Sequence, residues 1–96
     1  DLARAEELAQ SAIQHQLLAI EDPDTPNLYL LRHYLGLAVI QRQRGRWDEV
    51  RKTCDQGAEV AERLRKSQPD HPTVPLIQED LRRIKQAAEQ SDTTGR

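Results

Sequence analysis

Two apolar patterns of helical period meet at a single glycine, Gly45, and this junction limits the folds open to the chain. After Gly45, residues recur at steps of three or four, which marks one face of a helix: Trp47, Val50, Cys54, Gly57, Ala61 and Leu64. Before Gly45, apolar residues cover more than half of a helix circumference, from Leu28 to Ile40. Because glycine is the usual residue where a helix end needs a positive φ, the sequence predicts two helices joined by a tight turn.

A second glycine, Gly57, lies in the middle of the apolar stripe of the later helix. Glycine inside a helix costs about 1 kcal/mol relative to alanine, so its presence on a buried face calls for a packing reason. The sequence therefore predicts a close approach of a neighbouring helix at Gly57.

Two proline-bearing links divide the rest of the chain. Pro23 and Pro69 both begin a Pro-Asp-x-Pro segment and lie 46 residues apart, a period typical of helical arrays. Since prolines do not fit a helix interior, the links separate helices, and Thr25 and Pro26 suit the N-cap and first position of the second one. We predict an all-α domain over residues 1–90, with helices at about 2–20, 27–44, 47–66 and 74–90 and a disordered tail at 91–96.

The apolar patterns of the four segments also predict their places in the fold. The second helix is apolar on two sides and should be central, packed on its predecessor and its successor. The first helix should be amphipathic. Its sequence places residues at steps of three or four, Leu2, Ala5, Ala9, Ala12, Gln16 and Ile20, with Leu8, Ile13 and Leu17 beside them. The fourth has a single stripe that suits a terminal capping helix: Ile77, Leu81, Ile84 and Ala88.

Composition narrows the classes of function. The only cysteine of the 96 residues, Cys54, excludes a disulfide framework and favours a reducing, cytoplasmic compartment. No run approaches the roughly 18 apolar residues that a membrane span requires. The formal charge of −2 is uneven, with six acids against one arginine in residues 1–26 and nine bases against five acids in residues 27–66. These opposed blocks could pair within the chain or between chains.

No motif in the sequence predicts catalysis. Cys54 falls on an inward stripe, where a free cysteine is usually inert packing. His15, His33 and His71 lie on different segments without metal-ligand spacing, and the acids of the first proline link lack the spacing of a calcium loop. We therefore expect no enzyme, no metal and no cofactor.

Basic residues cluster around the Gly45 turn: Arg42, Arg44, Arg46, Arg51 and Lys52. Three interpretations remain open for this cluster, namely a solvated turn, a contact for an acidic protein, and a contact for nucleic acid. Nucleic-acid binding is the least favoured, because it usually brings a larger basic excess and exposed aromatic residues for stacking.

The order of large, small and aromatic residues around Gly45 resembles one tetratricopeptide repeat, at Tyr34, Leu37, Ala38, Gly45, Trp47, Val50 and Gly57. Gln41 stands where that family usually has an aromatic residue, and Val50 is larger than the usual alanine. The long second helix and the link Pro69-Asp70-His71-Pro72 are similar to the longer repeat variant of kinesin light chains and many bacterial repeat proteins.

The resemblance implies a short right-handed α-solenoid of antiparallel hairpins that binds a protein or peptide without catalysis. Positions that match the family's concave binding face are Arg32, Leu35, Val39, Arg42 and Gln43, with Gly36 beside them. An apolar floor with two arginines would favour an apolar partner that carries acidic residues. The alternative is self-assembly, as a homodimer or by end-to-end stacking, with the repeat ends as the interface.

Overall fold

The computed structural model describes residues 1–19 and 28–94, and these form four α-helices with no strand among them. The helices are α1 (Leu2–Ala19), α2 (Leu28–Gln43), α3 (Trp47–Ser67) and α4 (Thr73–Thr94). The all-α class and the four predicted segments are confirmed. The predicted cap at Thr25 and Pro26, and Ile20 of the first stripe, lie outside the described residues.

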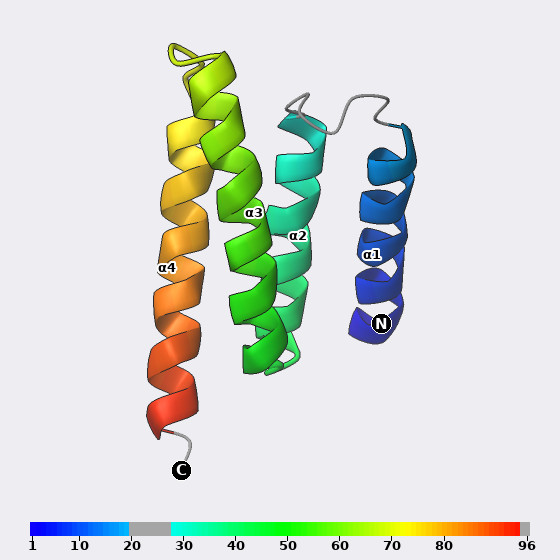
Figure 1. Cartoon of the computed structure of the whole chain (residues 1–96). Coiled ribbons are helices and arrows are strands. Elements are labelled where there is room, and N and C mark those ends of the chain that lie inside the picture. The colour runs from blue at the N-terminus through cyan, green and yellow to red at the C-terminus, as the bar shows by residue number, and fades with distance from the viewer. Residues whose placement is uncertain (20–27, 95–96) are drawn as a thin grey trace.

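Successive helices run antiparallel, and α2 is the central helix of the fold (Figure 1). α2 packs against each of the other three helices, and α4 packs against both α2 and α3. Among the described residues, α1 packs only against α2. The two-sided burial predicted for α2 is therefore confirmed.

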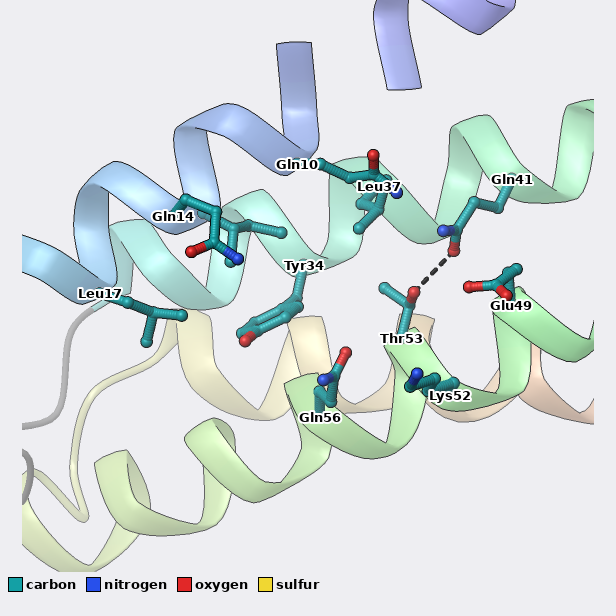
Figure 2. Close-up of a pocket in the computed structure, with 11 residues that line it drawn as sticks. Gln10, Gln14, Leu17, Tyr34, Leu37, Gln41, Glu49, Lys52, Thr53 and Gln56 are labelled. Carbon is teal, nitrogen blue, oxygen red and sulfur yellow. Dashed lines mark hydrogen bonds between the residues drawn. The ribbon is translucent and has the colours of Figure 1, made fainter. Parts of the chain in front are cut away.

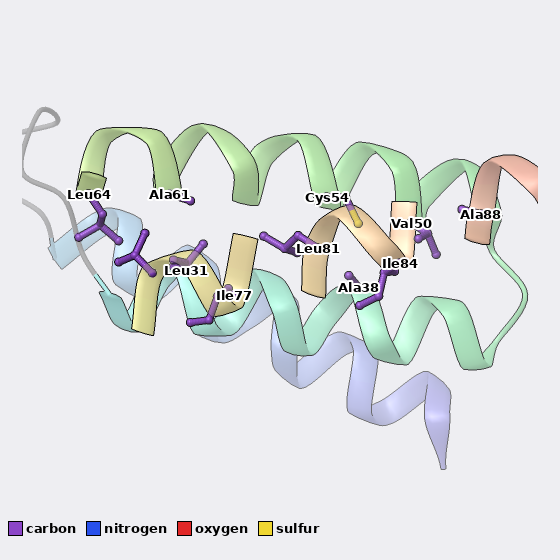
Figure 3. Close-up of a cluster of buried hydrophobic side chains, with 11 residues drawn as sticks. Leu31, Ala38, Val50, Cys54, Ala61, Leu64, Ile77, Leu81, Ile84 and Ala88 are labelled. Atoms are coloured by element: carbon purple, nitrogen blue, oxygen red, sulfur yellow. The ribbon is translucent and has the colours of Figure 1, made fainter. Parts of the chain in front are cut away.

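The main core lies where α2, α3 and α4 meet (Figure 3). It consists of Leu31, Ala38, Val50, Cys54, Ala61, Leu64, Val74, Ile77, Leu81, Ile84 and Ala88. The stripes predicted for α3 and α4 supply most of these residues, because a helix that buries one face needs apolar side chains at steps of three and four.

A smaller apolar cluster joins α1 to α2 and contains Ile13, Leu30, Tyr34 and Leu37. Ile13 is the one apolar side chain of α1 that is fully buried. Leu2 of the predicted stripe is exposed, as are Leu8 and Leu17 beside it, so the amphipathic pattern predicted for α1 holds only in part. The reason is that α1 rests on a single neighbouring helix.

The end of α2 is a Schellman motif centred on Gly45, whose φ is 72°. The Gly45 amide donates to the Arg42 carbonyl at 3.0 Å, and the Arg46 amide donates to the Gln41 carbonyl at 3.0 Å. These two hydrogen bonds satisfy carbonyl groups that a helix end leaves open. The turn predicted at Gly45 is thus confirmed with its physical cause.

The C-terminal helix differs from its predicted bounds at both ends. α4 begins at Thr73, whose backbone amide donates to His71 Nδ1 at 3.2 Å, so the link itself caps the helix. It continues to Thr94, four residues past the predicted helix end at Gln90 and into the segment predicted as a tail, while residues 95–96 lie outside the described part. No strong helix breaker stands before Gly95, so nothing in the sequence stops the helix at Gln90.

At Gly57, α3 lies close to both α4 and α2. A Cβ atom added at this residue would lie 2.9 Å from Leu81 Cδ1 in α4 and 3.3 Å from Tyr34 Cβ in α2. The packing reason inferred from the sequence is therefore confirmed, since a Cβ at residue 57 would require both Leu81 and Tyr34 to shift.

Replacing Gly57 by leucine should abolish cooperative folding. The added side chain has no space between Leu81 and Tyr34, so we expect a loss above about 3 kcal/mol, a large share of the stability of a small domain. Thermal melting followed by circular dichroism measures this.

The matched control is Gly36→Leu in α2, because a Cβ atom there meets nothing within 4 Å. This variant should melt at or above the original temperature, since it removes a helical glycine at no steric cost. Equal melting of the two variants would contradict the close approach at Gly57.

Candidate functional site

The five predicted contact residues lie together on one side of α2. Arg32, Arg42 and Gln43 are exposed, Val39 retains 39% of its accessible surface, and Leu35 is half-buried. Leu35 packs against the main core to which α4 contributes, whereas α1 is held on another side of α2 through Leu30 and Leu37. We call the set Arg32, Leu35, Val39, Arg42 and Gln43 the α2 outer face.

The arginines around the Gly45 turn differ in what they contact. Arg44 and Arg46 donate from Nη1 to the two carboxylate oxygens of Glu6 in α1, at 2.9 and 2.6 Å. Arg51 pairs with Asp48 on its own helix. Three of the five residues in the predicted basic cluster therefore have carboxylate partners, and Arg44 and Arg46 share one of those carboxylates.

Arg32 and Arg42 are different, because neither makes an ion pair with any residue that the structure describes. Both guanidinium groups remain available on the α2 outer face. Their positive charge is not compensated at that surface, which favours acidic ligands.

Glu6 is a structural residue that the sequence analysis missed. It is only 2% exposed, and besides the two arginines it accepts a hydrogen bond from Gln10 Nε2 at 3.2 Å. A buried carboxylate needs such partners, and here they join α1 to the turn between α2 and α3. The available signal was a charged residue in line with inward Ala9 and Ile13, opposite a chain segment rich in arginine.

A crevice of about 300 Å³ lies among α1, α2 and α3, and the sequence analysis did not anticipate it (Figure 2). Its apolar lining consists of Ile13, Leu17, Tyr34 and Leu37, and four of its polar lining residues are glutamines, Gln10, Gln14, Gln41 and Gln56. The crevice includes the α2 residues that face α1, so it is separate from the α2 outer face. We call it the glutamine crevice.

One buried polar pair forms part of the crevice wall. Thr53 Oγ1 donates to Gln41 Oε1 at 2.6 Å, which links α3 to α2 (Figure 2). Gln41 is 1% exposed and Thr53 is 3% exposed. This pair explains how α2 accommodates glutamine where the resembled family has an aromatic residue: the cavity wall is closed by a hydrogen bond.

The side chains of Cys54 and Tyr34 are buried in the helix packing. Burial raises the pKa of the Cys54 thiol to about 11, so the thiol is protonated and a poor nucleophile at neutral pH. Burial also raises the pKa of Tyr34, with a further contribution from the charge of Glu59. Within residues 1–19 and 28–94, no three His, Cys, Asp or Glu side chains are grouped closely enough to hold a metal ion.

Among the described helices, none has both the length and the apolar character that crossing a membrane requires. Comparisons with protein-family models, with curated proteins and with solved structures gave no match. What the chain does must therefore be argued from its own surfaces.

Replacing Glu6 by alanine should loosen α1. The change leaves Arg44 and Arg46 without their shared partner and opens a buried position, so we expect a loss of about 2 kcal/mol, reduced by the partial exposure of both arginines. Urea unfolding measures the loss, and hydrogen exchange should show it concentrated in α1.

The control is Glu7→Ala on the same helix. Among the described residues Glu7 pairs only with Arg4, and both side chains are about 70% exposed, so its replacement should cost less than about 0.5 kcal/mol. Similar losses for the two variants, or unchanged exchange in α1, would show that the Glu6 contacts do not hold the helix.

Proposed function

We propose that the chain is a non-catalytic protein–protein interaction module that binds a peptide or partner protein through the α2 outer face. The observation that carries this proposal is the pairing of exposed Val39 with the uncompensated guanidinium groups of Arg32 and Arg42 on one side of a central, rigidly packed helix. A surface on a packed helix is pre-organised, which lowers the entropy lost on binding.

The partner in this proposal is an apolar segment that carries acidic residues. Leu35 and Val39 supply apolar area, and exposed Gly36 leaves open space between them and Arg32. Arginine binds carboxylates through two parallel hydrogen bonds, so Arg32 and Arg42 would orient the segment along the helix.

The same proposal includes a tetratricopeptide-type arrangement, a right-handed stack of antiparallel hairpins. Three observations support it: the α2–α3 hairpin closes at Gly45, small Gly57 permits the close approach, and α4 packs on both helices of that hairpin. In such a stack, α2 and α4 would be first helices of successive repeats, and the α2 outer face would belong to the concave surface. A cytoplasmic location goes with this proposal.

The test is selection of peptides from a random phage-displayed library on the immobilised protein, followed by measurement of their affinities. Selected peptides should be enriched in apolar and acidic residues. The double variant Val39→Glu, Arg42→Glu should lose at least about tenfold in affinity, since it removes apolar contact and reverses a charge.

The matched control is Ala58→Glu, Arg65→Glu, which makes the same kinds of change at exposed positions of α3. It should retain affinity, and both variants should retain helicity by circular dichroism. Equal binding by the two variants would remove the α2 outer face as the site.

A second candidate function is self-assembly through the ends of the helical array. One observation favours it: leucines are exposed on the two outer helices, at Leu2, Leu8, Leu17 and Leu18 in α1 and Leu76 in α4. Leu18 is the most exposed of these leucines and retains 82% of its accessible surface. Such side chains on terminal helices suit a homodimer or end-to-end stack.

Light scattering coupled to size exclusion, over a concentration series, separates the two functions. If the α2 outer face is the functional surface, the molar mass should stay near the 11.0 kDa of one chain at every concentration. A mass that doubles with concentration, and returns to the monomer in Leu8→Glu, Leu18→Glu, would instead make self-assembly the primary function.

A further inference from the structure

The glutamine crevice has a chemistry that the α2 outer face does not share. Its two charged lining residues, Glu49 and Lys52, have opposite signs, so the crevice has no net charge to attract an ion. Four of its lining residues are glutamines, and each glutamine carboxamide has both a hydrogen-bond donor and an acceptor.

The key group is the side-chain amide of Gln41. Its oxygen accepts the Thr53 hydroxyl, so its nitrogen must point elsewhere, and Figure 2 shows it turned away from Thr53 toward the side of Leu37. This nitrogen makes no hydrogen bond to any described residue. Gln41 lines the crevice but retains only 1% of its accessible surface, so its nitrogen borders the crevice as a nearly buried donor.

Gln10 complements Gln41 on the opposite wall. Its nitrogen donates to Glu6, which leaves its carbonyl oxygen as the group that can accept another hydrogen bond. Gln41 therefore presents a donor and Gln10 an acceptor, each fixed by a second hydrogen bond within the protein. A backbone peptide group offers the matching pair, a carbonyl oxygen and an N–H.

The other residues that line the crevice determine how many residues of a bound peptide fit and which type of side chain the peptide can place there. Gln14 and Gln56 lie on either side of the Tyr34 ring in Figure 2. The apolar lining of the crevice includes Ile13 and Leu37. The α1 edge from Gln10 to Leu17 spans seven residue steps, about 10 Å at 1.5 Å per step. An extended chain advances about 3.3 Å per residue, so the edge accommodates about three residues.

We propose that the glutamine crevice is a second binding site, which takes about three residues of an extended, uncharged polypeptide segment with an apolar side chain on Ile13 and Leu37. The glutamine carboxamides bind the backbone of this segment, so recognition depends on its conformation and on one apolar side chain. This site is independent of the α2 outer face, which selects for acidic charge.

The test uses the capped tripeptide acetyl-Ala-Leu-Ala-N-methylamide, titrated into the ¹⁵N-labelled 96-residue chain and followed by nuclear magnetic resonance. The side-chain amide resonances of Gln41 and Gln14 should shift and saturate in the millimolar range. An ester analogue that lacks the leucine N–H should bind about tenfold more weakly, the effect of one lost hydrogen bond.

Two double variants of equal chemistry locate the site. Gln14→Glu, Gln56→Glu replaces two exposed carboxamides of the crevice by acceptor-only carboxylates and should weaken the tripeptide about tenfold. Gln78→Glu, Gln86→Glu makes the same change on α4 and should leave the affinity unchanged.

Three results would overturn the proposal: no shift at the Gln41 side chain, equal affinity in the two glutamine variants, or equal affinity of the ester analogue. A tripeptide that loses binding in Val39→Glu, Arg42→Glu would lie on the α2 outer face instead. That outcome would reject the glutamine crevice and leave the proposed function standing, so the two failures are distinguishable.

Discussion

The close contact at Gly57 is the constraint on which the other contacts of the fold depend. Because residue 57 has no side chain, Leu81 of α4 and Tyr34 of α2 both reach the α3 backbone. Three helices can then share one core, in which Leu31, Val50 and Leu64 are completely or almost completely buried. The chain has no phenylalanine or methionine, so it has few large side chains that could fill wide gaps between helices. Close packing of its core therefore requires short distances between the helices.

α1 is attached by a different kind of interaction. Its apolar contact with α2 centres on Ile13. Its ion pairs join the Glu6 carboxylate to Arg44 and Arg46. Directional contacts fix the position of a helix at a few points without filling the space beside it. This explains why a crevice remains between α1 and α3, and why α1 exposes leucines that a more deeply packed helix would bury.

The sequence predicted the features that depend on local chemistry and missed those that depend on distant partners. Gly45 and the stripe of α3 could be predicted because helix ends and helical faces follow from residues a few positions apart. The residues of the α2 outer face were predicted from the resemblance to a tetratricopeptide repeat, and helical periodicity accounts for their lying on one side of α2. The partners of Glu6 could not be predicted, since Arg44 and Arg46 lie about 40 residues away and charge blocks alone do not choose a pair. The Gln41–Thr53 hydrogen bond likewise required knowledge of how α2 faces α3.

The ion pairs of Glu6 also determine which charges of the chain can act outward. If Arg44 and Arg46 were unpaired, the Gly45 turn would be the strongest basic surface and would compete with the α2 outer face for any acidic ligand. Their pairing with one buried carboxylate leaves Arg32 and Arg42 as the arginines of α2 without an ion pair to a described residue. The same carboxylate holds the Gln10 nitrogen and so sets the acceptor at the glutamine crevice. Glu6 therefore influences both surfaces of α2: it pairs the two arginines of the Gly45 turn, and it orients Gln10 at the glutamine crevice.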